Sequence, residues 1–207
     1  MRELIPTANR WVRPHKEGER SPAVLLLGEP ATGGLDRLVD LLTGVGFWVA
    51  PLRTAGVSDP AAIADLADWL AEARVLPGAD GRVFLCGVGG GATAVFLALG
   101  AIPGFSGAVG FFGAILYSSL DDAHPVHPLD LLFGSSVPLQ CHFAEEDPHT
   151  PRAHIATLRE RLGRGVVHQV FVLPGTSSGF FERDSVDVQA SLVRARRFFE
   201  RISRDLQ

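Results

Sequence analysis

The residues best placed to do chemistry lie within positions 83–92, which read Val-Phe-Leu-Cys-Gly-Val-Gly-Gly-Gly-Ala. An apolar run here enters a glycine-rich turn that leads into a helical pattern. This order is typical of a nucleophile elbow, G-x-Nu-x-G, in which the flanking glycines let the helix pass close to the strand. The flanking residues are Gly87 and Gly91, and the central residue is Gly89. The elbow pattern therefore carries no nucleophilic side chain.

The same turn has a second interpretation, because a glycine-rich turn between a strand and a helix also binds phosphate at the helix N-terminus. Residues 87–92 fit the looser dinucleotide-binding pattern that ends in alanine. However, the next apolar run, residues 108–112, has no Asp or Glu near its end to hold a ribose, and the chain has no Walker lysine. Phosphate binding is the weaker interpretation, and we expect no cofactor.

Other reactive side chains lie near this turn or in acidic segments. Cys86 could replace the missing nucleophile, but it ends an apolar run, which predicts a buried and unreactive thiol. Two groups combine His with acidic residues: Asp121, Asp122, His124 and His127 in one, and His142, Glu145, Glu146, Asp147 and His149 in the other. Neither group has a recognisable ligand spacing, so we expect no metal site.

The elements that must position these residues alternate along the chain. Strand-like apolar runs cover residues 23–27, 47–50, 83–86, 108–112, 139–143 and 166–173, and helical segments cover 35–43, 60–73, 92–99, 151–161 and 185–204. Asp59 stands before Pro60, a pattern typical of a helix cap followed by an N1 proline. Strands that alternate with crossover helices predict an α/β fold with a doubly wound, mainly parallel sheet.

The 207 residues suit one domain over positions 21–207, preceded by an N-terminal arm or edge hairpin over 1–20. Residues 117–136 form the longest stretch without a regular pattern, and they could cover a site as a lid. The net charge of −4 excludes a basic field for nucleic acid. We find no signal peptide and no apolar stretch long enough for a membrane helix. Two cysteines in apolar runs indicate free thiols in a cytoplasmic protein.

Further motifs outside the elbow follow one another along the chain in the order in which one known protein family carries them. They are residues 22–29 (PAVLLLGE), 46–51 (GFWVAP), 110–113 (GFFG), 137–138 (VP) with 142–147 (HFAEED) and Pro151, and 174–180 (PGTSSGF). Together with the elbow they resemble the dienelactone hydrolase family over roughly residues 20–200. The resemblance implies a fold of the α/β-hydrolase type in a single domain.

The resemblance also assigns roles to individual positions. That family acts through a Cys or Ser nucleophile, a His base and an Asp that orients the His. Asp147 matches the acid, and Glu29 matches a glutamate beside the nucleophile, but the nucleophile position is Gly89 and the base position is Ser178. The two oxyanion-hole donors map to Gly90, which keeps its amide, and to Pro30, which has no N–H.

These departures predict a dienelactone-hydrolase-like protein without hydrolytic activity, acting as a monomer or a homodimer. Its expected partner is a small carboxylate or ester-like ligand, or another protein. One alternative is an active ester or lactone hydrolase that uses unrecognised residues, such as His124 or His127. Another is a purely structural module with a filled pocket. An open cleft around Gly89 would favour ligand binding, and a collapsed one would favour a structural role.

Overall fold

The computed structural model describes residues 4–6, 10–14, 20–28, 33–54, 56–133, 135–162, 168–177 and 185–205. The strands are β1 (Ile5–Pro6), β2 (Ser21–Gly28), β3 (Trp48–Arg53), β4 (Ala79–Val88), β5 (Gly107–Phe111), β6 (Leu139–Ala144) and β7 (Gln169–Leu173). The helices are α1 (Gly33–Gly44), α2 (Asp59–Arg74), α3 (Gly90–Ala101), α4 (Pro128–Leu132), α5 (Arg152–Leu162) and α6 (Val186–Asp205). The strands form one sheet in the order β1-β3-β2-β4-β5-β6-β7.

Strands β2 to β7 pair in parallel, which confirms the predicted parallel sheet. From β2 the chain moves to β3 on one side and then returns to β4 on the other, so the strand order reverses between β2 and β4. In sheets of this kind, ligands bind outside the carboxyl ends of the strands at this reversal. The elbow motif, at the end of β4, therefore lies at the position where folds with this topology bind ligands.

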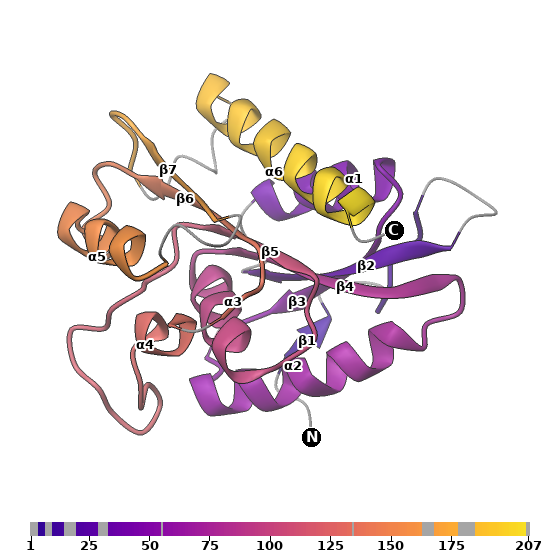
Figure 1. Cartoon of the computed structure of the whole chain (residues 1–207), viewed down its shortest axis with the longest axis horizontal. Helices are drawn as coiled ribbons and strands as arrows, with labels where there is room; N and C mark the ends of the chain where they lie inside the picture. The colour runs from indigo at the N-terminus through magenta and orange to yellow at the C-terminus, as the bar shows by residue number, and fades with distance from the viewer. Residues whose placement is uncertain are drawn as a thin grey trace.

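Helices cover both faces of the sheet (Figure 1): α1 and α6 lie on the upper side in that view, and α2 and α3 on the lower. Two buried apolar clusters correspond to these layers. One joins the sheet to α2, α3, α4 and α5, and the other joins it to α1 and α6. None of the helices in the described part of the chain is long and apolar enough to cross a membrane.

The structure gives detail to two segments that the sequence leaves open, the irregular stretch 117–136 and the expected arm or edge hairpin over 1–20. The short helix α4 lies inside the stretch 117–136, which has no regular pattern in the sequence. At the sheet edge, β1 pairs antiparallel with β3, and Val12 forms an isolated antiparallel bridge to Val49. Residues 166–167 of the expected last strand lie outside the described residues, and β7 begins at Gln169.

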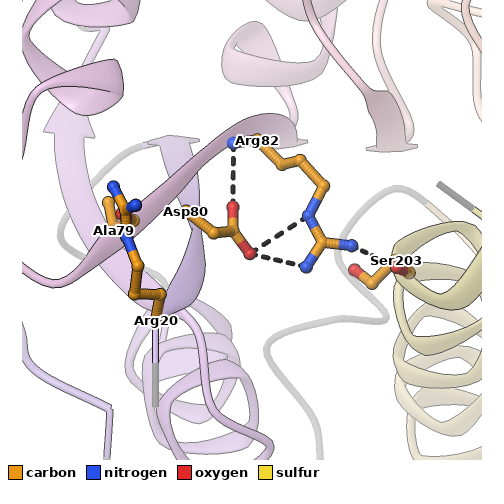
Figure 2. Close-up of polar contacts among 5 residues, drawn as sticks. All are labelled: Arg20, Ala79, Asp80, Arg82 and Ser203. Carbon is orange, nitrogen blue, oxygen red and sulfur yellow. Dashed lines mark hydrogen bonds and ion pairs between the residues drawn. The ribbon is translucent and has the colours of Figure 1, made fainter. Parts of the chain in front are cut away.

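The last turns of α6 are fastened to the start of β4 by Arg82 (Figure 2). The Asp80 carboxylate accepts hydrogen bonds from the Arg82 amide at 2.8 Å and from Arg82 Nε at 3.0 Å. Arg82 Nη1 in turn donates to the backbone carbonyl of Ser203. On the neighbouring strand edge, Arg20 Nε donates to the Ala79 carbonyl at 2.9 Å. The Arg82–Ser203 bond thus joins the end of α6 to the start of β4, at the amino end of the sheet.

Candidate functional site

The elbow predicted from the sequence is present between β4 and α3. Gly89 follows the last residue of β4 and has φ 58° and ψ −122°, a backbone conformation that favours glycine. Its amide donates to the Phe111 carbonyl at 2.9 Å, and its own carbonyl accepts the Ala92 amide at 2.9 Å. The turn is thus tied to β5 on one side and to the first turn of α3 on the other.

The glycines of the elbow are required for different reasons. A Cβ on Gly87 would lie 2.4 Å from the Gly91 carbonyl oxygen, and a Cβ on Gly91 would lie 2.2 Å from the Leu27 carbonyl oxygen. By contrast, no heavy atom of another described residue lies within 4 Å of a Cβ built on Gly89. The flanking glycines are therefore needed for packing, whereas Gly89 is favoured only by its backbone angles. A side chain at position 89 would project into open space.

The end of β5 packs directly against the start of α3. A Cβ on Gly113 would lie 2.6 Å from the Thr93 amide nitrogen, and one on Gly110 would lie 2.7 Å from the Phe96 ring. Between them Phe112 has φ 42°, the one positive φ of a non-glycine residue in the described ranges. Such an angle is strained for a bulky side chain. The backbone strain therefore lies one residue beyond the carbonyl that holds Gly89.

Asp147, the predicted acid, lies in the loop that follows β6 and is buried. Its Oδ1 accepts a hydrogen bond from the His149 amide at 2.9 Å, so the carboxylate stabilises its own loop. The loop after β7 lies alongside: the Glu146 amide donates to the Thr176 carbonyl at 2.9 Å, and the Gly175 amide donates to Glu145 Oε2 at 2.9 Å. The acid loop thus contacts the segment just before the predicted base position.

Three of the predicted site residues, Glu29, Pro30 and Ser178, lie outside the described residues, and their roles stay predictions. Gly90, the predicted oxyanion donor, is the first residue of α3. Its amide therefore has no acceptor within the helix, because the first N–H groups of a helix point beyond its end.

A cavity of about 480 Å³ opens beside Gly90. It is bounded by the β3–α2 connection, the first turns of α2 and α3, and the loop after β5. Its lining residues are Thr54, Gly56, Val57, Ser58, Asp59, Ala62, Gly90, Thr93, Ala94, Tyr117, Ala123 and His124. The cleft at the elbow is therefore open, and the predicted lid segment supplies part of its wall.

Asp59, Tyr117 and His124 form a polar cluster on that wall. Tyr117 donates its hydroxyl to Asp59 Oδ2 at 2.9 Å, and His124 Nδ1 lies 3.2 Å from the same oxygen. The Tyr117 and His124 rings contact each other in a tilted arrangement, with centroids 4.6 Å apart. Burial and the bond to Asp59 raise the pKa of Tyr117, so its hydroxyl remains a donor. His127 instead accepts the Tyr117 amide at 3.1 Å and fixes the loop.

Asp59 and Tyr117 are site residues that the sequence pattern does not indicate. The prediction that Asp59 caps α2 is wrong: the helix begins at Asp59 itself, and the residue at the cap position is Ser58. The Asp59 amide donates to the Ala123 carbonyl at 2.9 Å, which joins α2 to the lid segment. The one sequence signal here is Asp59 before Pro60, and that pattern indicates a helix start without indicating a site residue.

Cys86 and His142, two reactive side chains singled out in the sequence, both lie buried in the sheet region. Cys86 is fully buried in the cluster beneath α1 and α6, as predicted, and burial raises the pKa of its thiol. His142 is buried on the face of the sheet, stacked between the rings of its register neighbours Phe111 on β5 and Phe171 on β7. Among the described residues, no group of three or more His, Cys, Asp or Glu side chains is arranged to hold a metal ion.

Comparison with solved structures places the chain among α/β-hydrolase folds. A candidate dienelactone hydrolase from Klebsiella pneumoniae subsp. pneumoniae MGH 78578 superposes with a TM-score of 0.80 at 18% identity, over 93% of this chain and 91% of the other. Est1E from Butyrivibrio proteoclasticus gives 0.74 at 11% identity, over 93% and 92%. The apo form of esterase 2 from Thermogutta terrifontis gives 0.74 at 16% identity, over 93% and 88%.

The model of the dienelactone hydrolase family matches residues 53–203. The chain therefore belongs to that family. No protein of curated function matches the chain in sequence. Two of the similar esterases are also solved with small carboxylates, Est1E with ferulic acid and the Thermogutta terrifontis esterase with butyrate.

Proposed function

We propose that this protein is a non-hydrolytic member of the dienelactone hydrolase family that binds a small carboxylate or ester-like ligand in the cavity beside Gly90. One observation carries the proposal: the elbow keeps its geometry without a side chain at position 89, and an open cavity of about 480 Å³ lies beside the next residue, Gly90. A filled pocket would have favoured a structural module. The open one supports a binding site.

The cavity offers a carboxylate or a carbonyl oxygen a suitable donor. The Gly90 amide lies at the N-terminus of α3, where the helix dipole favours negative charge. Val57, Ala62 and Ala94 supply apolar contacts for the rest of a small ligand. The carboxylates found in two structurally similar esterases support this chemical class.

The proposed lack of hydrolysis rests on the reactive groups. Removing one triad member from a serine hydrolase leaves roughly 10³–10⁴-fold catalysis over water, through binding and the oxyanion hole. Losing one oxyanion donor costs on the order of a further 10²–10³-fold. With Gly89, Ser178 and Pro30 at the mapped positions, both losses apply and little acceleration remains.

A second function, ester or lactone hydrolysis, is favoured by the Asp59–His124 pair. The Asp59 carboxylate lies 3.2 Å from His124 Nδ1, and both residues line the same cavity as Gly90. His124 would then act as a general base on water, with no nucleophilic side chain. Activity of wild-type protein that is lost in His124→Ala and Asp59→Asn, but kept in His149→Ala, would establish this second function.

The binding proposal is tested by calorimetric titration with ferulic acid and butyrate, alongside turnover assays with activated esters and enol lactones. We expect saturable binding without turnover. Ala94→Phe should fill the cavity and abolish binding, whereas Ala101→Phe, at the exposed far end of the same helix, should leave it unchanged. Binding that survives Ala94→Phe would contradict the proposed site.

The remaining parts of the proposal concern the context of the protein. We place it in the cytoplasm, where Cys86 and Cys141 would stay reduced as the free thiols found in the structure. We propose that it acts as a monomer or a homodimer, with residues 21–207 as the functional domain. Thiol titration under native conditions and sedimentation analysis test these points.

A further inference from the structure

We propose a second binding site, for a small phosphate-bearing molecule, at the amino edge of the sheet. A cavity of about 490 Å³ lies there between α6 and the first residues of β6 and β7. Its lining residues are Gln140, Gln169, Arg194, Arg197, Phe198, Glu200, Arg201 and Arg204. It lies at the opposite end of the strands from Gly89, so it is independent of the function proposed above.

Four arginines line this cavity and make it strongly positive, although the whole chain carries a net charge of −4. Glu200 is its one acidic lining residue, and Arg196, outside the lining, pairs with Glu200 at 3.0 Å. Within the described part of the chain, Arg194, Arg197 and Arg201 form no ion pair with a carboxylate. A guanidinium group needs an acidic partner or water, and three that converge unpaired on one cavity favour an anion.

The floor of the cavity presents further donors. Burial lowers the pKa of His142 to about 3, with a smaller contribution from Arg194, so the imidazole is neutral. His142 Nε2 lies 2.9 Å from Gln140 Oε1 and donates to it, and Gln140 Nε2 donates to Gln169 Oε1 at 2.6 Å. Because Gln169 Oε1 already accepts from Gln140, the Gln169 amide has donors left for an acceptor, and both glutamines line the cavity. The floor is therefore compatible with an acceptor.

Arg201 supplies the most specific sign of an absent acceptor. Its Nε and Nη2 atoms are shielded from solvent, and no acceptor among the described residues bonds to them. These two atoms form one fork of the guanidinium group, the arrangement that binds a phosphate or carboxylate bidentately. Buried donors without partners are rare in folded proteins. An anion in the cavity would satisfy them after a rotamer change of this long side chain.

The framework around these arginines is rigid. Arg194 lies over the Phe171 ring at 4.9 Å, and Arg201 lies 5.7 Å from the Phe198 ring. Arg82 holds the Ser203 carbonyl next to Arg204 (Figure 2), so the last turns of α6 cannot swing away. A concave site of this volume fits a small molecule. Because four lining side chains are arginines and only one, Glu200, is acidic, a multiply charged phosphate is the preferred occupant.

The test is calorimetric titration of the full chain with pyrophosphate, inorganic phosphate and citrate at constant ionic strength. We expect saturable binding of pyrophosphate, tighter than that of citrate. Arg201→Gln and Arg197→Gln should each weaken it on the order of tenfold or more. Arg161→Gln makes the same charge change on α5, where Arg161 pairs with Asp130, and should leave binding unchanged.

Thermal unfolding of each variant shows whether it is folded. If Arg201→Gln does not fold, Arg197→Gln still tests the site. No saturable binding to wild type would overturn the proposal. An equal loss in Arg161→Gln would reduce the effect to general electrostatics and would also overturn it. Citrate binding as tight as pyrophosphate binding would contradict the phosphate assignment.

Discussion

Two cavities of nearly equal volume, about 480 and 490 Å³, lie at the carboxyl and amino ends of the strands, which we call the carboxyl edge and the amino edge. The walls of the two cavities are built differently. At the carboxyl edge, the elbow wall consists of backbone: glycines, a helix N-terminus and one exposed amide. At the amino edge, the walls consist of long cationic side chains on α6. Gly87 and Gly91 are held by close backbone contacts that do not involve catalysis. Backbone packing can therefore preserve the geometry of an elbow whether or not its central residue carries a reactive side chain.

The largest expected effect is on stability, and it distinguishes a glycine needed for close packing, Gly91, from one favoured by its backbone angles, Gly89. Gly91→Ala places a Cβ 2.2 Å from the Leu27 carbonyl oxygen, so the free energy of unfolding should fall by about 3 kcal/mol or more. Gly89→Ala meets no neighbour and should lose only about 1–2 kcal/mol, through its positive φ. Urea denaturation measures both. Equal losses would mean that the two glycines do not have separate roles.

The second expected effect concerns the amino edge and depends on pH. The pKa of His142 is lowered to about 3 when folded, whereas it is about 6.5 in the unfolded chain. Below about pH 6.5 the unfolded state therefore binds a proton that the folded state does not. Stability should fall by about 1.4 kcal/mol per pH unit from about pH 6.5 towards pH 3 through this residue.

His142→Phe removes the titrating group and should flatten that part of the stability profile. Phe fits between the flanking Phe111 and Phe171 rings, at the cost of the bond to Gln140. His149→Gln, in the loop after β6, serves as the control and should keep the slope. If His142→Phe loses stability with acid as steeply as wild type, the acid sensitivity arises elsewhere.

The smallest expected effect concerns the side-chain wall of the carboxyl-edge cavity. Tyr117→Phe removes the hydroxyl that donates to Asp59, leaving a buried carboxylate with one fewer donor. The free energy of unfolding should fall by about 1–2 kcal/mol. In a double-mutant cycle with Asp59→Asn, the two losses should not add. Additive losses would show that the bond is not formed in solution.

Much of the fold follows from the sequence, because its signals are local. The apolar runs that precede Gly28 and Gly89 fix the strands, and the ordered glycines fix the elbow. The cluster at the cavity could not be predicted, because Tyr117 is 58 residues from its partner Asp59. On α6, the helical spacing of arginines is visible in the sequence, but the Gln140 floor opposite them is not.

The most direct test of the central claim is to return the missing groups to the elbow. Burst-phase acylation by an activated ester should be absent in wild type, Gly89→Cys and Ser178→His. It should appear in the Gly89→Cys/Ser178→His protein, because a nucleophile and its base act as a unit. Adding Pro30→Ile should increase it by restoring an oxyanion N–H. An acyl-enzyme on wild type, or none on the folded triple variant, would contradict the account.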